Sequence, residues 1–396
     1  MMLHVPIGKN PPPAFNVAIG KNALMTRRAF LGVAAASVGV LAASFTTGCT
    51  DFDASGSGND ARTITDMAGR EVSVPQHIES VYSTGQPGVV SLYILAPDKL
   101  LGWCMKPSSV EAEYLEQQYL DLPVLGLMQG QNNTANREEI ISRAPDAILL
   151  MTSLQEDADR ESAVGDADAI ARKMGIPTVV ADYSLKATGE AFRFLGDLLD
   201  CEQRAEDLAS YCDRVYANAL VNSASIADAD RVRVYYAQGQ SGLQTAPQGS
   251  EHSEVLDLVG ADNVVKLEAG SGGRVNVDME QVLIWNPKVI VTSYAMSHSA
   301  DGQAVFTLIE EGNKSWSEVS AVRSGSVYNT PAYPFNWQDM PPSANRIIGI
   351  SWLGNLLYPE LFDIDIRKET QSFYQLFYRV ELSDVQLEVL LVGAIR

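Results

Sequence analysis

The side chains in this sequence that could do chemistry are amides, hydroxyls and aromatic rings in short segments that follow apolar runs. The sequence has four histidines and lacks the Gly-x-Ser-x-Gly, His-Glu-x-x-His, phosphate-loop and Gly-x-Gly-x-x-Gly motifs. Amides, hydroxyls and rings suit reversible binding of a bulky, partly polar compound by hydrogen bonding and stacking. The candidate ligand-binding residues are Gln86, Asn132, Asn133, Tyr183, Gln240, Tyr294, His298, Phe335, Trp337 and Arg346.

Several of these candidates have a second interpretation that the sequence leaves open. Tyr294 and His298 could ligate a metal or a haem iron, or could form hydrogen bonds only. Phe335 and Trp337 could line a cleft, or could pack beneath helices near the end of the chain. Arg346 could hold a carboxylate or an oxyanion with both arms of its guanidinium group, or could pair with a nearby acid on the surface of its own helix.

An internal repeat indicates the elements that position these residues. Segments 138–150 and 280–292 both begin with a glutamate that stands seven residues before a proline, Pro145 or Pro287. In both segments the proline precedes an apolar run of strand length. Because proline stops a helix, each copy is predicted to be a short helix that leads into a buried strand.

A second pair of similar segments lies upstream of the first. Segment 94–101 resembles segment 258–265, and each follows a stretch that begins with Val-Tyr, at Val81 or at Val234. The similar elements recur in the same order, so we expect two lobes of similar α/β topology. In open parallel sheets, ligands bind beyond the carboxyl ends of the strands, which here would be the loops that face each other across a cleft.

The stretch between the two copies is predicted to be one long helix. Apolar residues recur at helical spacing from Cys201 to Ser225, without an internal proline or glycine. Cys201 and Cys212 would be about 16 Å apart along this helix, too far for a disulfide. Ser343 could cap a helix that runs through Leu357, and further helices are expected near 365–378 and 383–392.

The amino terminus has the pattern of an export signal. Arg27 and Arg28 precede a short apolar run, and a small-residue segment then ends at Cys49. This arrangement is typical of a twin-arginine signal, and Cys49 stands where a lipoprotein would be acylated. Thr46 departs from the apolar residue that is usual there, so Cys49 could instead be an ordinary linker residue. Met25 is an alternative start to Met1.

The charge of the chain argues against nucleic-acid binding. The formal net charge is -20, and the first 48 residues hold four of the 29 basic residues and none of the 49 acidic ones. The remainder therefore has 25 basic and 49 acidic residues, a net charge of -24. Such a surface repels phosphate backbones and anionic lipid headgroups.

Four segments, taken in order, resemble a known family. Residues 65–75, 95–102, 280–290 and 321–328 are similar to the solute-binding proteins (class III periplasmic binding proteins) that serve iron–siderophore, haem and cobalamin ABC importers. The resemblance covers roughly residues 62–345. It implies an α/β fold of two Rossmann-like lobes joined by a single long α-helix, here with C-terminal helices added.

The resemblance also implies a function. We expect a monomeric, extracytoplasmic receptor, lipid-anchored or periplasmic, that captures an iron(III)–siderophore-type chelate and delivers it to an ABC permease. A receptor for haem, cobalamin or a molybdate-like oxyanion, and a secreted enzyme with an interlobe active site, remain alternatives. No cofactor is expected apart from a metal in the ligand. The residues predicted to dock on the permease are Glu111, Glu113 and Glu254.

These expectations divide the chain into six parts. The predicted parts are an export signal (1–48), a flexible tether (49–61), an N-terminal lobe (62–200), a connecting helix (201–225), a C-terminal lobe (226–342) and C-terminal helices (343–396).

Overall fold

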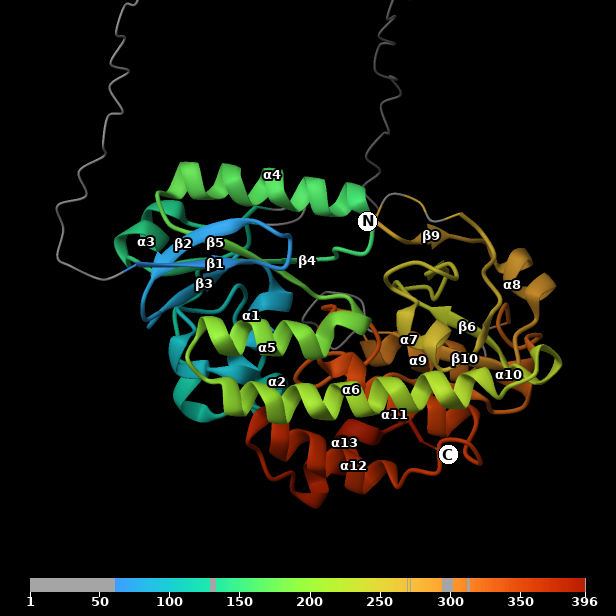
Figure 1. Cartoon of the computed structure of the whole chain (residues 1–396). Helices are drawn as coiled ribbons and strands as arrows, with labels where there is room; N and C mark the ends of the chain where they lie inside the picture. Colours follow the sequence, from blue (N-terminus) through green and yellow to red (C-terminus); the bar gives the residue numbers. More distant parts are fainter. Residues whose placement is uncertain are drawn as a thin grey trace, which may run out of the picture. The chain divides into compact units, whose positions relative to one another are not determined.

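The computed structural model describes residues 61–128, 133–268, 270, 272–293, 302–311 and 314–395 (Figure 1). The predicted export signal and Cys49 lie outside these residues. Within the described part, no helix is both long and apolar enough to cross a membrane.

The N-terminal lobe is built on a parallel sheet with strand order β3-β4-β5. Alternate residues of its strands face opposite layers: Leu149 and Met151 pack toward α1 and α5, whereas Ile148 and Leu150 face α3 and α4. A hairpin of β1 and β2 precedes the sheet. The elements are β1 (Ala61–Thr65), β2 (Glu71–Pro75), β3 (Val81–Ser83), α1 (Gln86–Leu95), α2 (Ser109–Ala112), α3 (Arg137–Ser142), β4 (Ala147–Thr152), α4 (Asp157–Met174), β5 (Thr178–Asp182) and α5 (Thr188–Leu198).

The C-terminal lobe has a second parallel sheet, with strand order β11-β10-β6-β8. One face of this sheet, which includes Tyr235 and Ile290, forms a separate core within the lobe. The other face, which includes Tyr236 and Val291, joins the large core described below. The elements are β6 (Arg233–Ala237), β7 (Gln244–Thr245), α7 (Glu254–Leu258), β8 (Asp262–Asn263), β9 (Val275–Asn276), α8 (Met279–Trp285), β10 (Val289–Thr292), α9 (Gly302–Glu310), α10 (Ser320–Arg323) and β11 (Val327–Asn329).

The predicted internal repeat is confirmed at the level of the backbone. Helices α3 and α8 each lead into a buried strand, β4 and β10. The residue before the proline is left-handed in both copies, with φ 48° at Ala144 and 42° at Asn286. The similarity between segments 94–101 and 258–265 is also confirmed. In the first copy the amide of Leu101 donates to the carbonyl of Val81. In the second copy the amide of Val264 donates in the same way to the carbonyl of Val234.

The two lobes are joined by α6 (Glu202–Ala224), the long helix that the sequence predicted. It packs against α5, α7 and α11 (Asn345–Leu357), and Figure 1 shows it running across the molecule from one lobe to the other. The terminal helices α12 (Ile366–Phe373) and α13 (Asp384–Leu391) follow, with a π-helical turn over Tyr374–Tyr378 between them. Cys201 and Cys212 are free thiols, as expected.

One prediction about these helices is wrong. Ser343 does not cap α11, because the cap position falls on Ala344 and the Ser343 hydroxyl is buried without a hydrogen-bond partner. The helix start is instead buried in the protein, where Asn345 donates to the carbonyl of Phe335 at 2.9 Å. Tertiary packing therefore replaces the local cap.

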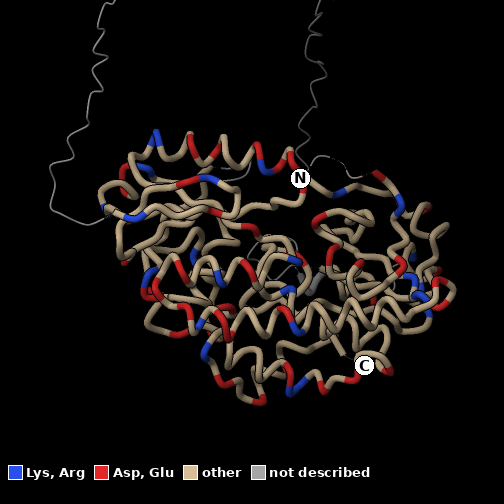
Figure 2. The backbone as a smooth tube through the Cα atoms, in the orientation of Figure 1, with Lys and Arg blue, Asp and Glu red and all other residues tan. Residues whose placement is uncertain are grey.

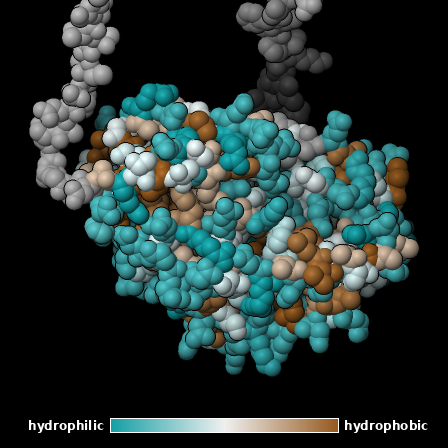
Figure 3. Space-filling model, viewed as in Figure 1, coloured by the Kyte–Doolittle hydropathy of each residue, from teal (hydrophilic) through white to brown (hydrophobic). Residues whose placement is uncertain are grey.

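The largest apolar core is continuous from one lobe to the other. It includes Leu149 of the first sheet, Leu208 of α6, Trp352 of α11, Phe377 near the end of the chain and Val291 of the second sheet. Because this core passes through α6 and the terminal helices, the lobes are fixed to a common helical layer. The face shown in Figure 3 is mostly polar, and apolar side chains are exposed there only in small groups.

Candidate ligand-binding cleft

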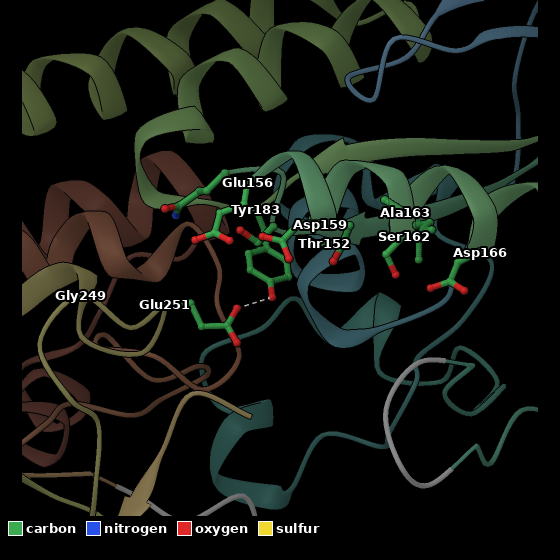
Figure 4. A pocket seen from close by; sticks show the side chains of 12 residues that line it. Thr152, Glu156, Asp159, Ser162, Ala163, Asp166, Tyr183, Gly249 and Glu251 are labelled. Carbon is green, nitrogen blue, oxygen red and sulfur yellow. Dashed lines mark hydrogen bonds between the residues drawn. The ribbon is translucent and has the colours of Figure 1, made fainter. Parts of the chain in front are cut away.

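A cavity of about 350 Å³ lies between the two lobes, near the carboxyl ends of β4 and β5. Such a volume lies at the lower end of the range for small-molecule sites. The first lobe contributes the end of β4, the first three turns of α4 and Tyr183, and the second lobe contributes the loop before α7 (Figure 4). The lining residues are Leu150, Thr152, Ser153, Gln155, Glu156, Asp159, Ser162, Ala163, Asp166, Tyr183, Gly249 and Glu251.

The lining of this cavity is acidic. Glu156, which precedes α4, and Asp159 and Asp166 of α4 line it from the first lobe, and Glu251 lines it from the second (Figure 4). Among the described residues, no lysine or arginine lines the cavity. Figure 2 shows acidic and basic residues mixed along much of the remaining backbone.

Tyr183 and Glu251 close one side of the cavity. The Tyr183 hydroxyl donates to a Glu251 carboxylate oxygen at 2.8 Å, so this bond joins the two lobes. Burial, followed by the neighbouring Glu251 charge, raises the pKa of Tyr183 far above its ordinary value. The phenol therefore stays protonated and remains a hydrogen-bond donor at any physiological pH.

A second polar cluster lies behind the loop that carries Glu251. The fully buried carboxylate of Asp339 contacts the His252 Nδ1 atom at 2.5 Å and accepts from Arg274 at 2.5 Å. Gln238, at the end of β6, accepts from the Arg274 Nε atom at 3.2 Å. His252 Nε2 lies 3.1 Å from the Gly272 carbonyl. The positive charge of Arg274 is thus already paired with Asp339.

The structure places several predicted ligand-binding residues away from this cavity. Trp337 is fully buried and its indole N–H donates to the Tyr374 hydroxyl at 3.4 Å, so its ring packs in the core, as in the second interpretation above. Phe335 is partly buried against Tyr378. Arg346 is fully buried and pairs with Glu254, so it pairs with an acid as in the second interpretation, but the acid belongs to α7 and not to its own helix.

Of the other candidates, some lie away from the cavity, one lines it, and some lie outside the described residues. Gln86 opens α1 and is half-buried, and Gln240 is exposed in a turn. Asn133 is exposed, and its side chain accepts from the amide of Ala135 at 3.2 Å, as a turn former does. Tyr183 is the one predicted ligand-binding residue that lines the cavity among those the structure describes. Asn132, Tyr294 and His298 lie outside the described residues.

The predicted permease-docking residues differ in how accessible they are. Glu113 is exposed in the first lobe. Glu111 is half-buried, and its carboxylate accepts from the Ser108 amide at 2.6 Å in a capping box. Glu254 does not fit a docking role at the rim, because both of its carboxylate oxygens are engaged between the lobes.

Sequence reasoning missed the acidic residues of α4 and Glu251. The rule that ligands bind beyond the carboxyl ends of parallel strands was applied to the loops after β3 and β5 but not to the loop after β4. The same rule would have led to residues 153–159.

Comparison with known proteins places the chain in a family. The family model for periplasmic binding proteins matches residues 128–334, which is more than half of the chain. The chain belongs to the periplasmic binding protein family. A solved structure of an ABC transporter solute-binding protein from Sulfurospirillum deleyianum is 30% identical, covers 83% of this chain and 98% of its own, and superimposes with a TM-score of 0.73.

Two further relatives of this periplasmic binding protein cover most of its length. The molybdate-binding protein MolA of Haemophilus influenzae is 25% identical over 340 residues, 80% of this chain and 91% of that protein. A periplasmic solute-binding protein from Veillonella parvula has the same fold, with 23% identity, coverage of 85% and 98%, and a TM-score of 0.67. The chain is thus a periplasmic solute-binding protein of an ABC transporter, and proteins of this family act outside the cytoplasm as transport receptors rather than enzymes.

Proposed function

We propose that this periplasmic binding protein captures a neutral or cationic metal chelate, of the iron(III)–siderophore type, and delivers it to an ABC permease. The observation that carries the proposal is the acidic lining of the interlobe cavity. Cavity hydroxyls and amides, such as Ser162 and Gln155, can hydrogen-bond to chelate oxygens. The carboxylates attract a positive charge without acting as the primary ligands of the metal.

Charge separates this proposal from the oxyanion alternative. Two unit charges about 6–8 Å apart interact by roughly 2–3 kcal/mol at an effective dielectric constant of about 20. A dianion in the cavity would experience about twice this repulsion, roughly 4–6 kcal/mol, from each nearby carboxylate. The buried cations behind the cleft do not offset it, because Arg274 is paired with Asp339 and Arg346 with Glu254.

The oxyanion receptor remains the second candidate because the Haemophilus influenzae relative is named a molybdate-binding protein. Haem and cobalamin are further alternatives within the same family. Haem carries two carboxylates of its own, so the acidic lining disfavours it in the same way, whereas a neutral corrinoid is not disfavoured by charge.

We further propose the delivery route that the sequence suggests. Residues 1–48 direct export, Cys49 is acylated and holds the receptor at the membrane, and residues 50–60 act as the tether. The mature protein works as a monomer with lobes over 62–200 and 226–342. Exposed Glu113 docks on the permease. Mass spectrometry of receptor isolated from its own membrane tests this route, since an unmodified Cys49 would exclude the anchor.

A calorimetric titration against three ligands tests the cargo. The panel contains a cationic ferric trihydroxamate, an anionic ferric tris-catecholate and molybdate. We expect the trihydroxamate to bind most tightly, and the double variant Asp159→Asn/Glu251→Gln to weaken it by about tenfold or more. Glu138→Gln, an exposed acid on α3 outside the cavity, is the matched control and should leave the affinity unchanged. Tighter binding of molybdate than of either chelate, increased further by the double variant, would establish the oxyanion receptor instead.

A further inference from the structure

Arg346 lies where three parts of the chain meet. Its side chain is only 1% exposed, and it projects from the first turn of α11. One guanidinium nitrogen donates to a carboxylate oxygen of Glu254, which opens α7 in the second lobe. Another donates to the main-chain carbonyl of Tyr183, which follows β5 in the first lobe. Arg346 therefore links both lobes to the helical layer.

Glu254 extends the same link back to the first lobe. One of its carboxylate oxygens accepts from the Gln155 side chain at 2.6 Å, and both lie 3.3 Å from the amide of Leu185. Its side chain is 17% exposed, so most of its charge is removed from water. An isolated charge would be unstable in such a place, and the two ions stabilise each other.

Tyr183 connects this buried ion pair to the cavity. Its carbonyl accepts from Arg346, while its hydroxyl donates to Glu251 at 2.8 Å. Gln155 likewise contacts Glu254 and lines the cavity. Two cavity residues of the first lobe are thus held in place by the same ion pair.

We propose that Arg346 is a positioning residue that sets the spacing of the two lobes and holds Tyr183 at the cavity wall. It does so through Glu254 and without touching the cargo. The predicted effect of Arg346 on chelate affinity rests on the proposed function. The predicted effect of Arg346 on lobe spacing does not depend on the cargo. Ligand affinity depends on this ion pair because a cavity formed by two lobes binds well only at one separation.

Spin labels on the two lobes test the proposal without ligand. Glu138→Cys and Glu280→Cys place labels at equivalent, exposed positions of the repeat, one on each lobe. Cys49 and Cys201 are changed to serine so that neither takes up a spin label. Cys104 and Cys212 are kept, because they are buried and do not react with the label. We expect Arg346→Gln to broaden the distance distribution or shift it to longer values. Arg143→Gln breaks an exposed ion pair within one lobe and is the matched control.

Three outcomes are decisive. An unchanged distance distribution in folded Arg346→Gln would overturn the proposal, whatever the cargo is. If the wild type binds the ferric trihydroxamate, Arg346→Gln should weaken that binding by about tenfold, and Arg346→Lys should restore part of it. If the wild type binds none of the three ligands but the distances still change, the proposed function fails while the positioning role stands. Should Arg346→Gln not fold, Arg346→Lys, which keeps the positive charge but loses the two-armed contact, is used in the same measurement.

Discussion

Replacing Glu254 by glutamine should destabilise the protein strongly. The substitution preserves shape and leaves the Arg346 guanidinium, 1% exposed, without its charged partner. Breaking a buried ion pair from one side costs about 3–5 kcal/mol. We expect a loss near the lower end, about 3 kcal/mol, because Glu254 retains 17% exposure and the Tyr183 carbonyl still accepts from Arg346.

Urea unfolding followed by circular dichroism measures this loss. Glu139→Gln, which breaks the exposed pair with Arg143, should change the free energy of unfolding by no more than about 0.5 kcal/mol. The double variant Glu254→Met/Arg346→Met removes both charges and should cost less than Glu254→Gln alone. A loss below about 1 kcal/mol for Glu254→Gln would refute the view that this ion pair is buried and mutually dependent.

Two further predictions concern stability. Hydrogen bonding from Arg193 lowers the pKa of Glu206 from 4.5 to about 2, so its contribution is present above pH 4.5 and lost as the pH falls toward 2. The difference in melting temperature between wild type and Glu206→Gln should therefore close over that range, and a constant difference would contradict it. Gly349→Ala should lower the melting temperature markedly, because the added carbon would collide with the Trp337 carbonyl. Gly165→Ala, on the open surface of α4, should instead raise the free energy of unfolding by up to about 1 kcal/mol. Equal effects of the two substitutions would refute the close approach of α11 to the Trp337 carbonyl.

The fold could be predicted from the sequence to the extent that it depends on periodic patterns. The repeated helix–proline–strand pattern and the unbroken helical spacing of α6 are local signals, and the structure contains both. The start of α11 was mispredicted because its cap is replaced by contacts with distant residues, such as that between Asn345 and the Phe335 carbonyl.

The site was harder to predict for a physical reason. In sequence, Glu156, Asp159 and Asp166 look like the solvated face of an amphipathic helix, and only the position of the second lobe turns that face into a cavity wall. Conversely, the aromatic rings at Phe335 and Trp337 satisfied the chemistry of a ligand site, but their surroundings place Trp337 in the core. The burial of a loop side chain depends on tertiary contacts that have no local sequence signal.

Residues near the C-terminus pack against the N-terminal lobe and complete it. Arg379 donates to the carbonyls of Tyr93 and Ile94 at 3.0 and 2.9 Å, and the Tyr114 hydroxyl donates to the Gln386 carbonyl at 2.9 Å. A nascent chain on the ribosome cannot make these contacts until almost all of its residues have been synthesised. The first lobe can therefore complete its packing only after the last helices have been synthesised. Until then its apolar surface is exposed, and chaperones can bind it.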